Sequence, residues 1–235
     1  MLKQVIGKNI KELDANEFTA NLSRFVHVMI DLGTGDGKFA YNYARNNPAA
    51  FVIGIDASAE SMEETSYKAS RKPAKGGLDN LVLLWASAEQ LPAELTGLAN
   101  EIYINFPWGS LLAGVVKAEP VVMENIAKVI HPLGKIHIFI SYDAKYEPQI
   151  MEQLDLPELS LTYFNNMRPR YNKFGIGVDG VTQLTDEQKR QLTSSWPKKI
   201  LSQRQRDIYY VTAHVISESD YEYRHPIPDP TMYLE

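Results

Sequence analysis

The chain has 235 residues, and none of them is cysteine. Disulfide bonds, thiolate metal sites and cysteine-held iron–sulfur clusters are therefore excluded, and so is any reaction that needs a thiolate nucleophile. Histidine is scarce as well. The five histidines, which show no metal-ligand spacing, are His27, His131, His137, His214 and His225. We expect no bound metal.

Long apolar runs are also missing. No stretch approaches the roughly 20 apolar residues that a membrane-spanning helix needs. Residues 1–14 mix Lys, Gln and Glu with apolar residues and contain no signal-peptide core. These features predict a cytoplasmic protein without membrane contact. The length suits one well-packed domain, placed at residues 1–217, and residues 218–235, with three prolines and five acids, are predicted to form a loosely ordered tail.

The net charge is only −5, but the charges are unevenly distributed. Of the 24 Lys and Arg residues, 13 stand in three windows that contain no acid. The first window holds Lys68, Arg71, Lys72 and Lys75, the second holds Arg168, Arg170 and Lys173, and the third holds Lys189, Arg190, Lys198, Lys199, Arg204 and Arg206. One charged run is usually a solvated face, whereas three together favour a surface that follows phosphates.

Strand-like apolar runs alternate with helical stretches through most of the chain. Strands are expected near 26–32, 50–56, 80–86, 101–106, 134–142, 174–182 and 207–216, and helices near 17–25, 37–46, 59–71, 119–129, 146–154, 158–168 and 185–195. This alternation predicts a doubly wound α/β fold, with a seven-stranded, mostly parallel sheet and an antiparallel edge. Residues 1–24, with a short hairpin around Gly7, are interpreted as an N-terminal extension, and residues 145–172 as an insertion between strands five and six.

Residues 28–37, Val-Met-Ile-Asp-Leu-Gly-Thr-Gly-Asp-Gly, form the most informative motif. An apolar strand ends in Asp31, and Gly33, Gly35 and Gly37 follow at every second position. Glycine at these positions permits a tight turn and lets a ligand approach the backbone. The spacing differs from the G-x-G-x-x-G of dinucleotide-binding proteins. It resembles motif I of class I S-adenosylmethionine-dependent methyltransferases, with NAD binding and a structural glycine turn as alternatives.

Two acidic motifs follow the next strands. Asp56 ends the apolar run 51–56, where a carboxylate can accept hydrogen bonds from both ribose hydroxyls of a cofactor. Its alternative role is to cap the following helix. Ser87-Ala88-Glu89 follows the third strand, at a position that contacts the cofactor adenine in this fold class, unless it too is only a helix cap.

An aromatic motif, Asn105-Phe106-Pro107-Trp108, follows the fourth strand. Ligands bind outside the carboxyl ends of such strands. The motif resembles the Asn/Asp-Pro-Pro-aromatic pattern of amino methyltransferases, with Phe106 in place of the first proline. Because Trp108 stands between a proline and a glycine, it is poorly placed for a core and is expected to stack on a base. Trp196, among the cations of the third window, is expected to be a second stacking residue.

Together these segments resemble the aminoglycoside-resistance methyltransferases that act on N1 of adenine 1408 in 16S ribosomal RNA. The resemblance rests on residues 31–37, 54–56, 72–78, 88–89 and 106–112, and on Trp196 with Lys199, Arg204 and Arg206, and it extends from about residue 1 to 216. It implies S-adenosyl-L-methionine as the cofactor, 16S rRNA in the assembled small (30S) ribosomal subunit as the substrate, and reduced aminoglycoside binding as the consequence. We expect the enzyme to act as a monomer.

The resemblance also implies roles for single residues. Trp108 and Trp196 would sandwich the target adenine, and Arg206 would hold its flipped backbone. The residues expected at the cofactor are Asp31, Gly33, Gly35, Asp56, Ala88, Glu89, Asn105, Phe106, Pro107, Ser110 and Ser195. Those expected at RNA phosphates are Lys68, Arg71, Lys72, Lys75, Lys199 and Arg204.

Adenine N1 carries an in-plane lone pair and is unprotonated at pH 7, so no general base is predicted. Three alternatives stay open. A transfer-RNA guanine-N7 methyltransferase has a similar sheet but usually a more basic N-terminal arm. A small-molecule methyltransferase would need a lid over its substrate. A non-catalytic ribosome-binding module would bind the cofactor without turnover.

Overall fold

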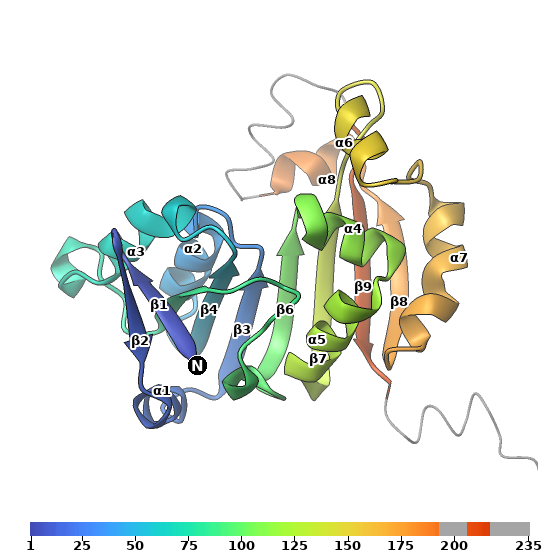
Figure 1. Ribbon diagram of the computed structural model, residues 1–235. Helices are drawn as coiled ribbons and strands as arrows, with labels where there is room; N and C mark the ends of the chain where they lie inside the picture. Colours follow the sequence, from blue (N-terminus) through green and yellow to red (C-terminus); the bar gives the residue numbers. More distant parts are fainter. Residues whose placement is uncertain (193–205, 217–235) are drawn as a thin grey trace, which may run out of the picture.

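The computed structural model describes residues 1–192 and 206–216 (Figure 1). Within these residues the centre is a nine-stranded sheet with the order β2-β1-β5-β4-β3-β6-β7-β9-β8. The strands are β1 (Leu2–Ile6), β2 (Asn9–Leu13), β3 (His27–Leu32), β4 (Ala50–Asp56), β5 (Leu81–Trp85), β6 (Ala99–Asn105), β7 (Ile130–Ile140), β8 (Ile176–Gln183) and β9 (Tyr209–Val215). Strands β3 to β7 are parallel, and β9 and β8 add an antiparallel edge, as the sequence predicts.

Helices pack on both faces of the sheet. They are α1 (Ala15–Leu22), α2 (Lys38–Asn46), α3 (Glu63–Ala69), α4 (Gly109–Lys117), α5 (Pro120–Val129), α6 (Pro148–Gln153), α7 (Leu161–Asn172) and α8 (Asp186–Gln191), with 3-10 turns at Glu60–Met62, Pro73–Lys75 and Ala93–Leu95. Helices α4, α5 and α7 cover one face (Figure 1), and α2 and α3 pack against the other. The strand order reverses between β3 and β6, which is where open α/β sheets bind ligands.

The sheet has two more strands than the seven that the sequence predicts. The hairpin around Gly7 forms, and its strand β1 pairs antiparallel with β5 through Gln4 and Leu84. Leu2 joins the core on one face of the sheet and Val5 joins the core on the other. The N-terminal segment is therefore a continuation of the sheet, because its apolar side chains are buried on both faces.

The predicted elements leave out α4, which begins directly after Trp108. Its residues 111–116 are all buried. A helix that is apolar on every side lacks the alternation of polar and apolar positions that reveals a surface helix. Between β7 and β8, Phe164 and Tyr171 of α7 are buried in the main core, so this helix forms part of a layer of the fold. No helix in the described ranges is both long and apolar enough to cross a bilayer.

Candidate functional site

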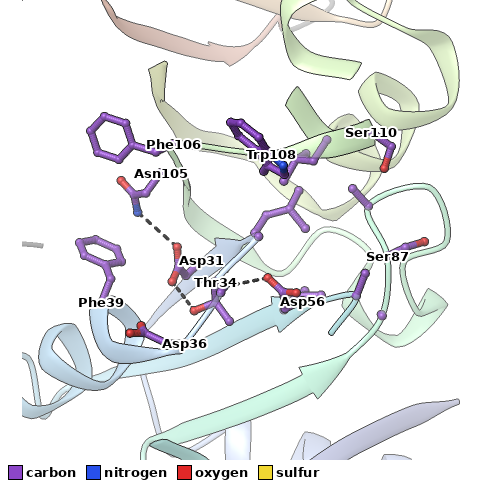
Figure 2. A pocket seen from close by; sticks show the side chains of 18 of the residues that line it. Asp31, Thr34, Asp36, Phe39, Asp56, Ser87, Asn105, Phe106, Trp108 and Ser110 are labelled. Atoms are coloured by element: carbon purple, nitrogen blue, oxygen red, sulfur yellow. Dashed lines mark hydrogen bonds between the residues drawn. The ribbon is translucent and has the colours of Figure 1, made fainter. Parts of the chain in front are cut away.

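A pocket of about 210 Å³ opens at the carboxyl ends of β3, β4, β5 and β6 (Figure 2). Four acids line it, namely Asp31, Asp36, Asp56 and Glu89, and no lysine or arginine is among its described lining residues. Acids gathered in a cleft create a negative potential that attracts a cation. The pocket is therefore suited to a ligand that carries positive charge.

The glycine motif forms the loop that leads from β3 into α2. Gly33, Gly35 and Gly37 all have positive φ angles, of 75°, 57° and 72°. Only glycine adopts this region without strain. A Cβ atom on Gly33 would also lie 2.6 Å from the Leu111 side chain of α4. The loop therefore needs glycine both for its conformation and for its packing beside the pocket.

Asp31, at the end of β3, is 1% exposed. Its carboxylate accepts hydrogen bonds from the Thr34 hydroxyl and, at 3.2 Å, from the Asn105 amide (Figure 2). Burial nevertheless raises the pKa of Asp31 to about 7, and the negative charges of Asp56 and Asp36 act in the same direction. A cation in the pocket would stabilise the ionised carboxylate and lower this pKa.

Asp56 holds the loop together at the end of β4. Its carboxylate accepts hydrogen bonds from the backbone N–H of Gly35 at 2.7 Å and of Ser58 at 2.8 Å. Neither bond caps a helix, because the next helical turn starts at Glu60. A carboxylate has about four lone-pair sites, so Asp56 can still accept hydrogen bonds from a diol.

Glu89 connects the loop after β5 to the start of α4. Burial alone would raise its pKa, but hydrogen bonds with the Ser110 hydroxyl, with its own backbone and with Ser87 lower the pKa below its ordinary value. Glu89 is therefore ionised at neutral pH. This link fixes the loop of residues 87–89 relative to the N-terminus of α4.

A strained turn carries the aromatic motif. Phe106 has a φ of 51°, unusual for a bulky residue, and its N–H donates to the Phe139 carbonyl at 2.8 Å. Proline, whose φ is fixed near −65°, cannot adopt this conformation, which explains why Phe106 replaces the first proline of the motif. The turn leaves Trp108 at the edge of the pocket with 54% of its surface exposed (Figure 2). An indole this exposed is not a core residue.

The pocket brings together most residues that the sequence assigns to the cofactor. Asp31, Gly33, Gly35, Asp56, Ala88, Glu89, Asn105, Phe106 and Ser110 all line it, and so does Trp108. Pro107 is buried in the turn and is not a lining residue, and Ser195 lies outside the described residues. Ser87, which stands in one motif with Ala88 and Glu89, also lines the pocket. The sequence assignments omit Thr34, Asp36 and Phe39, although Thr34 and Asp36 stand within the glycine motif. Phe39 stands two residues after Gly37, in the first turn of α2. Its closeness to the glycine motif could have indicated that it lines the pocket.

The first basic window covers the last turn of α3, with Lys68, and the compact loop that follows it. Lys68 places its ammonium 4.2 Å from the centre of the Tyr41 ring, and the Tyr41 hydroxyl donates to the Gly76 carbonyl at 2.7 Å. Gly77 packs so closely that a Cβ atom would lie 1.6 Å from the Arg71 carbonyl oxygen. This packing fixes the backbone, while the side chains that carry the charge, Lys68, Arg71, Lys72 and Lys75, are all exposed.

The other two windows mix exposed and enclosed cations, since Arg170, Lys173 and Arg190 are exposed. Arg168 of α7 donates to the Val178 carbonyl of β8, so it fixes a helix to the sheet. Lys189 is buried beside Asp186. In the third window, Lys198, Lys199 and Arg204, together with Trp196, lie outside the described residues.

Arg206 does not lie on an open surface as an RNA contact would require. It is 7% exposed, its guanidinium pairs with the Glu147 carboxylate, and it lies 5.1 Å from the centre of the Tyr146 ring. Its position differs from the sequence expectation because a carboxylate and an aromatic face, both from the segment before α6, enclose it. A phosphate could reach this guanidinium only if the Glu147 contact opened.

Comparison with known proteins identifies the family. The family model described as NpmA, 16S rRNA (adenine(1408)-N(1))-methyltransferase, matches residues 3–215. The chain belongs to the 16S rRNA (adenine(1408)-N(1))-methyltransferase family. A family member from Escherichia coli is 36% identical over 211 residues, which cover 89% of this chain and 96% of that protein.

Solved structures of the 16S rRNA (adenine(1408)-N(1))-methyltransferase family agree with the fold. The 16S rRNA methyltransferase KamB is 36% identical, with a TM-score of 0.83 over 92% of this chain and 100% of that one. A point mutant from Catenulisporales acidiphilia, solved with the cosubstrate SAM, is 32% identical, with a TM-score of 0.84 over 97% of this chain and 100% of that one. The predicted methyltransferase fold, family and S-adenosylmethionine cofactor are confirmed.

The described residues fit that cofactor. S-adenosylmethionine carries a sulfonium and an ammonium group. The described residues that line the pocket include four acids and no lysine or arginine. Asp56 retains lone pairs for the ribose hydroxyls, and the glycine loop exposes its backbone to the pocket. The side chains that line the pocket therefore match the positively charged groups of the cofactor and its ribose hydroxyls.

Proposed function

We propose that this enzyme transfers a methyl group to N1 of adenine 1408 in 16S rRNA, within the assembled small ribosomal subunit, and thereby reduces aminoglycoside binding. Family membership supports the reaction. The observation that carries the proposal is the exposed Trp108 at the edge of the acid-lined pocket, because an indole face there can hold a base next to the cofactor.

Chemistry at N1 needs positioning more than proton transfer. The cofactor supplies an electrophilic methyl group on its sulfonium, and adenine N1 supplies its own lone pair. The four acids that line the pocket all make other contacts. Asp56 bonds to the loop, Asp31 to Thr34 and Asn105, Glu89 to Ser110, and Asp36 to Lys38. We therefore assign no general base, and attribute the rate mainly to orientation of the two reactants.

The target base must leave its helix before N1 can be reached. Trp108 would stack on the extruded adenine, and cation–π attraction would stabilise the purine as it becomes positively charged. Trp196, as the second stacking residue, and Ser195, Lys199 and Arg204, as contacts to cofactor and phosphates, remain predictions about residues outside the described ranges.

The basic loop after α3 would hold the ribosomal RNA backbone. Its exposed cations, Lys68, Arg71, Lys72 and Lys75, stand on a backbone that is already ordered, so docking costs side-chain entropy but little backbone entropy. The enzyme would act as a cytoplasmic monomer. Arg206 would join this interaction only after release from Glu147, when the RNA phosphate replaces the carboxylate.

Reverse transcription provides the test. Purified 30S subunits, protein-free 16S rRNA and transfer RNA are incubated separately with enzyme and S-adenosylmethionine, and the RNA is copied afterwards. Methylation of N1 blocks base pairing, so we expect a stop next to adenine 1408 only with 30S subunits. The control is Asp56→Ala, which should bind the cofactor poorly and give no stop. Methyl incorporation into transfer RNA alone, or cofactor binding and 30S docking without any incorporation, would contradict the proposal.

A further inference from the structure

An exposed tyrosine lies outside the cofactor pocket, on α3, next to Lys68 in the chain. Tyr67 of α3 is 60% exposed. The turn of the N-terminal hairpin lies against α3 at this point (Figure 1), and the Gly7 N–H donates to the Ser66 hydroxyl at 2.9 Å. A Cβ atom on Gly7 would lie only 3.6 Å from the Tyr67 Cβ and 3.7 Å from its ring. The hairpin turn thus supports one side of the ring and leaves the rest open.

Positively charged side chains lie on one side of the Tyr67 ring, toward the hairpin turn and the C-terminal end of α3. Lys8 follows Gly7 in the turn, and Lys68 and Arg71 follow Tyr67 along the chain, all of them exposed. Glu63 and Glu64 stand four and three residues before Tyr67 in α3, so they lie on the same helix face as the ring, on its N-terminal side. The aromatic face therefore lies at the boundary of the basic loop, where the hairpin adds a cation from a separate segment of the chain.

We propose that Tyr67 and the hairpin turn form a stacking platform for an unpaired nucleotide of the RNA substrate, with Lys8 contacting its phosphate. This inference rests on the proposed function and extends its docking surface to the N-terminal hairpin. An aromatic ring with cations on its C-terminal side and in the hairpin turn suits a nucleotide, since the ring accepts any base and the cations bind the backbone phosphate. An acidic protein segment could use the same cations, but it has no need for the exposed ring.

Substitutions at Tyr67 separate stacking from packing. Tyr67→Ala and Tyr67→Leu should raise the KM for 30S subunits by about 5-fold or more, on the scale of one lost base stack, while kcat and S-adenosylmethionine affinity stay unchanged. Tyr67→Phe keeps the ring and should retain parental KM. Melting temperatures of all three variants control for folding. Equal KM values for the alanine, leucine and phenylalanine variants would overturn the proposal.

The hairpin contribution has a matched control. Lys8→Ala should weaken 30S binding and reduce its salt dependence, whereas Lys128→Ala, an exposed lysine on α5 at the other face of the sheet, should not. Equal effects of the two substitutions would mean that only overall charge matters and would overturn the role of Lys8.

Photo-cross-linking identifies the partner directly. A benzoylphenylalanine placed at position 67 should cross-link to 16S rRNA in 30S complexes, and the nucleotide can be mapped by reverse transcription. A cross-link to a ribosomal protein, or none at all, would overturn the proposal. Because this readout needs docking and not methyl transfer, an enzyme that cross-links to rRNA but leaves adenine 1408 unmodified would refute the proposed function and leave the platform standing.

Discussion

The buried carboxylate of Asp31 makes the stability of the folded protein depend on pH. In the unfolded chain its pKa is near 3.8, and in the folded protein burial raises it to about 7. Between these values the folded state binds the proton that the unfolded state has lost. The contribution of Asp31 to stability is therefore greatest at low pH and falls as pH rises through this window.

The ligand-free protein should therefore lose stability from this residue between pH 4 and pH 7. A shift of this size corresponds to at most about 4 kcal/mol. Asp31→Asn keeps one acceptor oxygen and turns the other into an amide donor, which a flipped Asn105 amide can accept. Because this side chain cannot titrate, the free energy of unfolding of the variant should change less over this range than that of the parent. Urea unfolding at pH 5 and pH 8 measures the difference. Parallel pH profiles for the two proteins would show that Asp31 does not titrate near neutrality.

The same carboxylate predicts how the cofactor binds. A sulfonium cation in the pocket would favour ionised Asp31, so S-adenosylmethionine binding should release a proton near pH 7. S-adenosylhomocysteine, which lacks the sulfonium charge, is the matched control and should release less. Calorimetry in two buffers of different ionisation enthalpy counts the protons. Equal proton release for both ligands would assign the effect to another group.

Trp108 lies at the edge of the pocket, where its indole can be removed without disturbing the core. With 54% of its surface exposed, the indole contributes little to the core, so its removal should leave the fold intact. Loss of base stacking, about 1–3 kcal/mol, should slow methylation about 5- to 150-fold in Trp108→Ala, with Trp108→Phe in between. Affinity for 30S subunits should fall less than the rate. A Trp108→Ala enzyme with the parental rate would refute the stacking role.

At the scale of elements, a buried ion pair joins two segments distant in the sequence. Glu147 stands directly before α6, and Arg206 stands just before β9. The side chains are only 11% and 7% exposed, so water screens their attraction poorly. The pair therefore fixes the segment after β7 against the start of β9.

Removing one partner should cost more than removing both. Glu147→Gln leaves the Arg206 charge buried, which typically costs about 3–5 kcal/mol of unfolding free energy. The double variant Glu147→Gln/Arg206→Met removes the charge as well and should recover part of this loss. Chemical denaturation of the parent, both single variants and the double variant forms the cycle. Additive losses would show that the two side chains act independently.

Sequence patterns predicted the parallel strands and the glycine loop because both depend on local chemistry. The runs ending in Asp31 and Asp56 are buried on both faces, and each glycine of the motif sits at a positive φ. Three features needed tertiary information. The β1–β5 pairing joins residues about 80 positions apart, α4 has no polar side, and the enclosure of Arg206 depends on Glu147, 59 residues earlier.

At the scale of the whole molecule, opposite charges are separated between two surfaces. The pocket gathers acids at the strand ends, where we propose that the cationic cofactor binds, and the end of α3 with its following loop gathers exposed cations that we propose contact RNA. A net charge near zero or below therefore does not argue against an RNA substrate. The sequence indicated the cations as a group, because they lie in one continuous window, residues 68–75. The four acids come from three segments that only the sheet brings together.

The acidic tail, residues 218–235, yields the last prediction. It carries five acids and one arginine, which accounts for most of the net charge of −5, and the family match ends at residue 215. Truncation after Ser217 should keep methylation of 30S subunits within a few-fold of the full chain. Because a negative segment repels RNA, the truncated enzyme should bind 30S subunits equally well or more tightly at low salt, with the difference shrinking as salt rises. Initial rates and 30S binding at 50–200 mM salt, with the full chain as control, test this. A loss of activity by more than tenfold would assign the tail a part in the fold or the site.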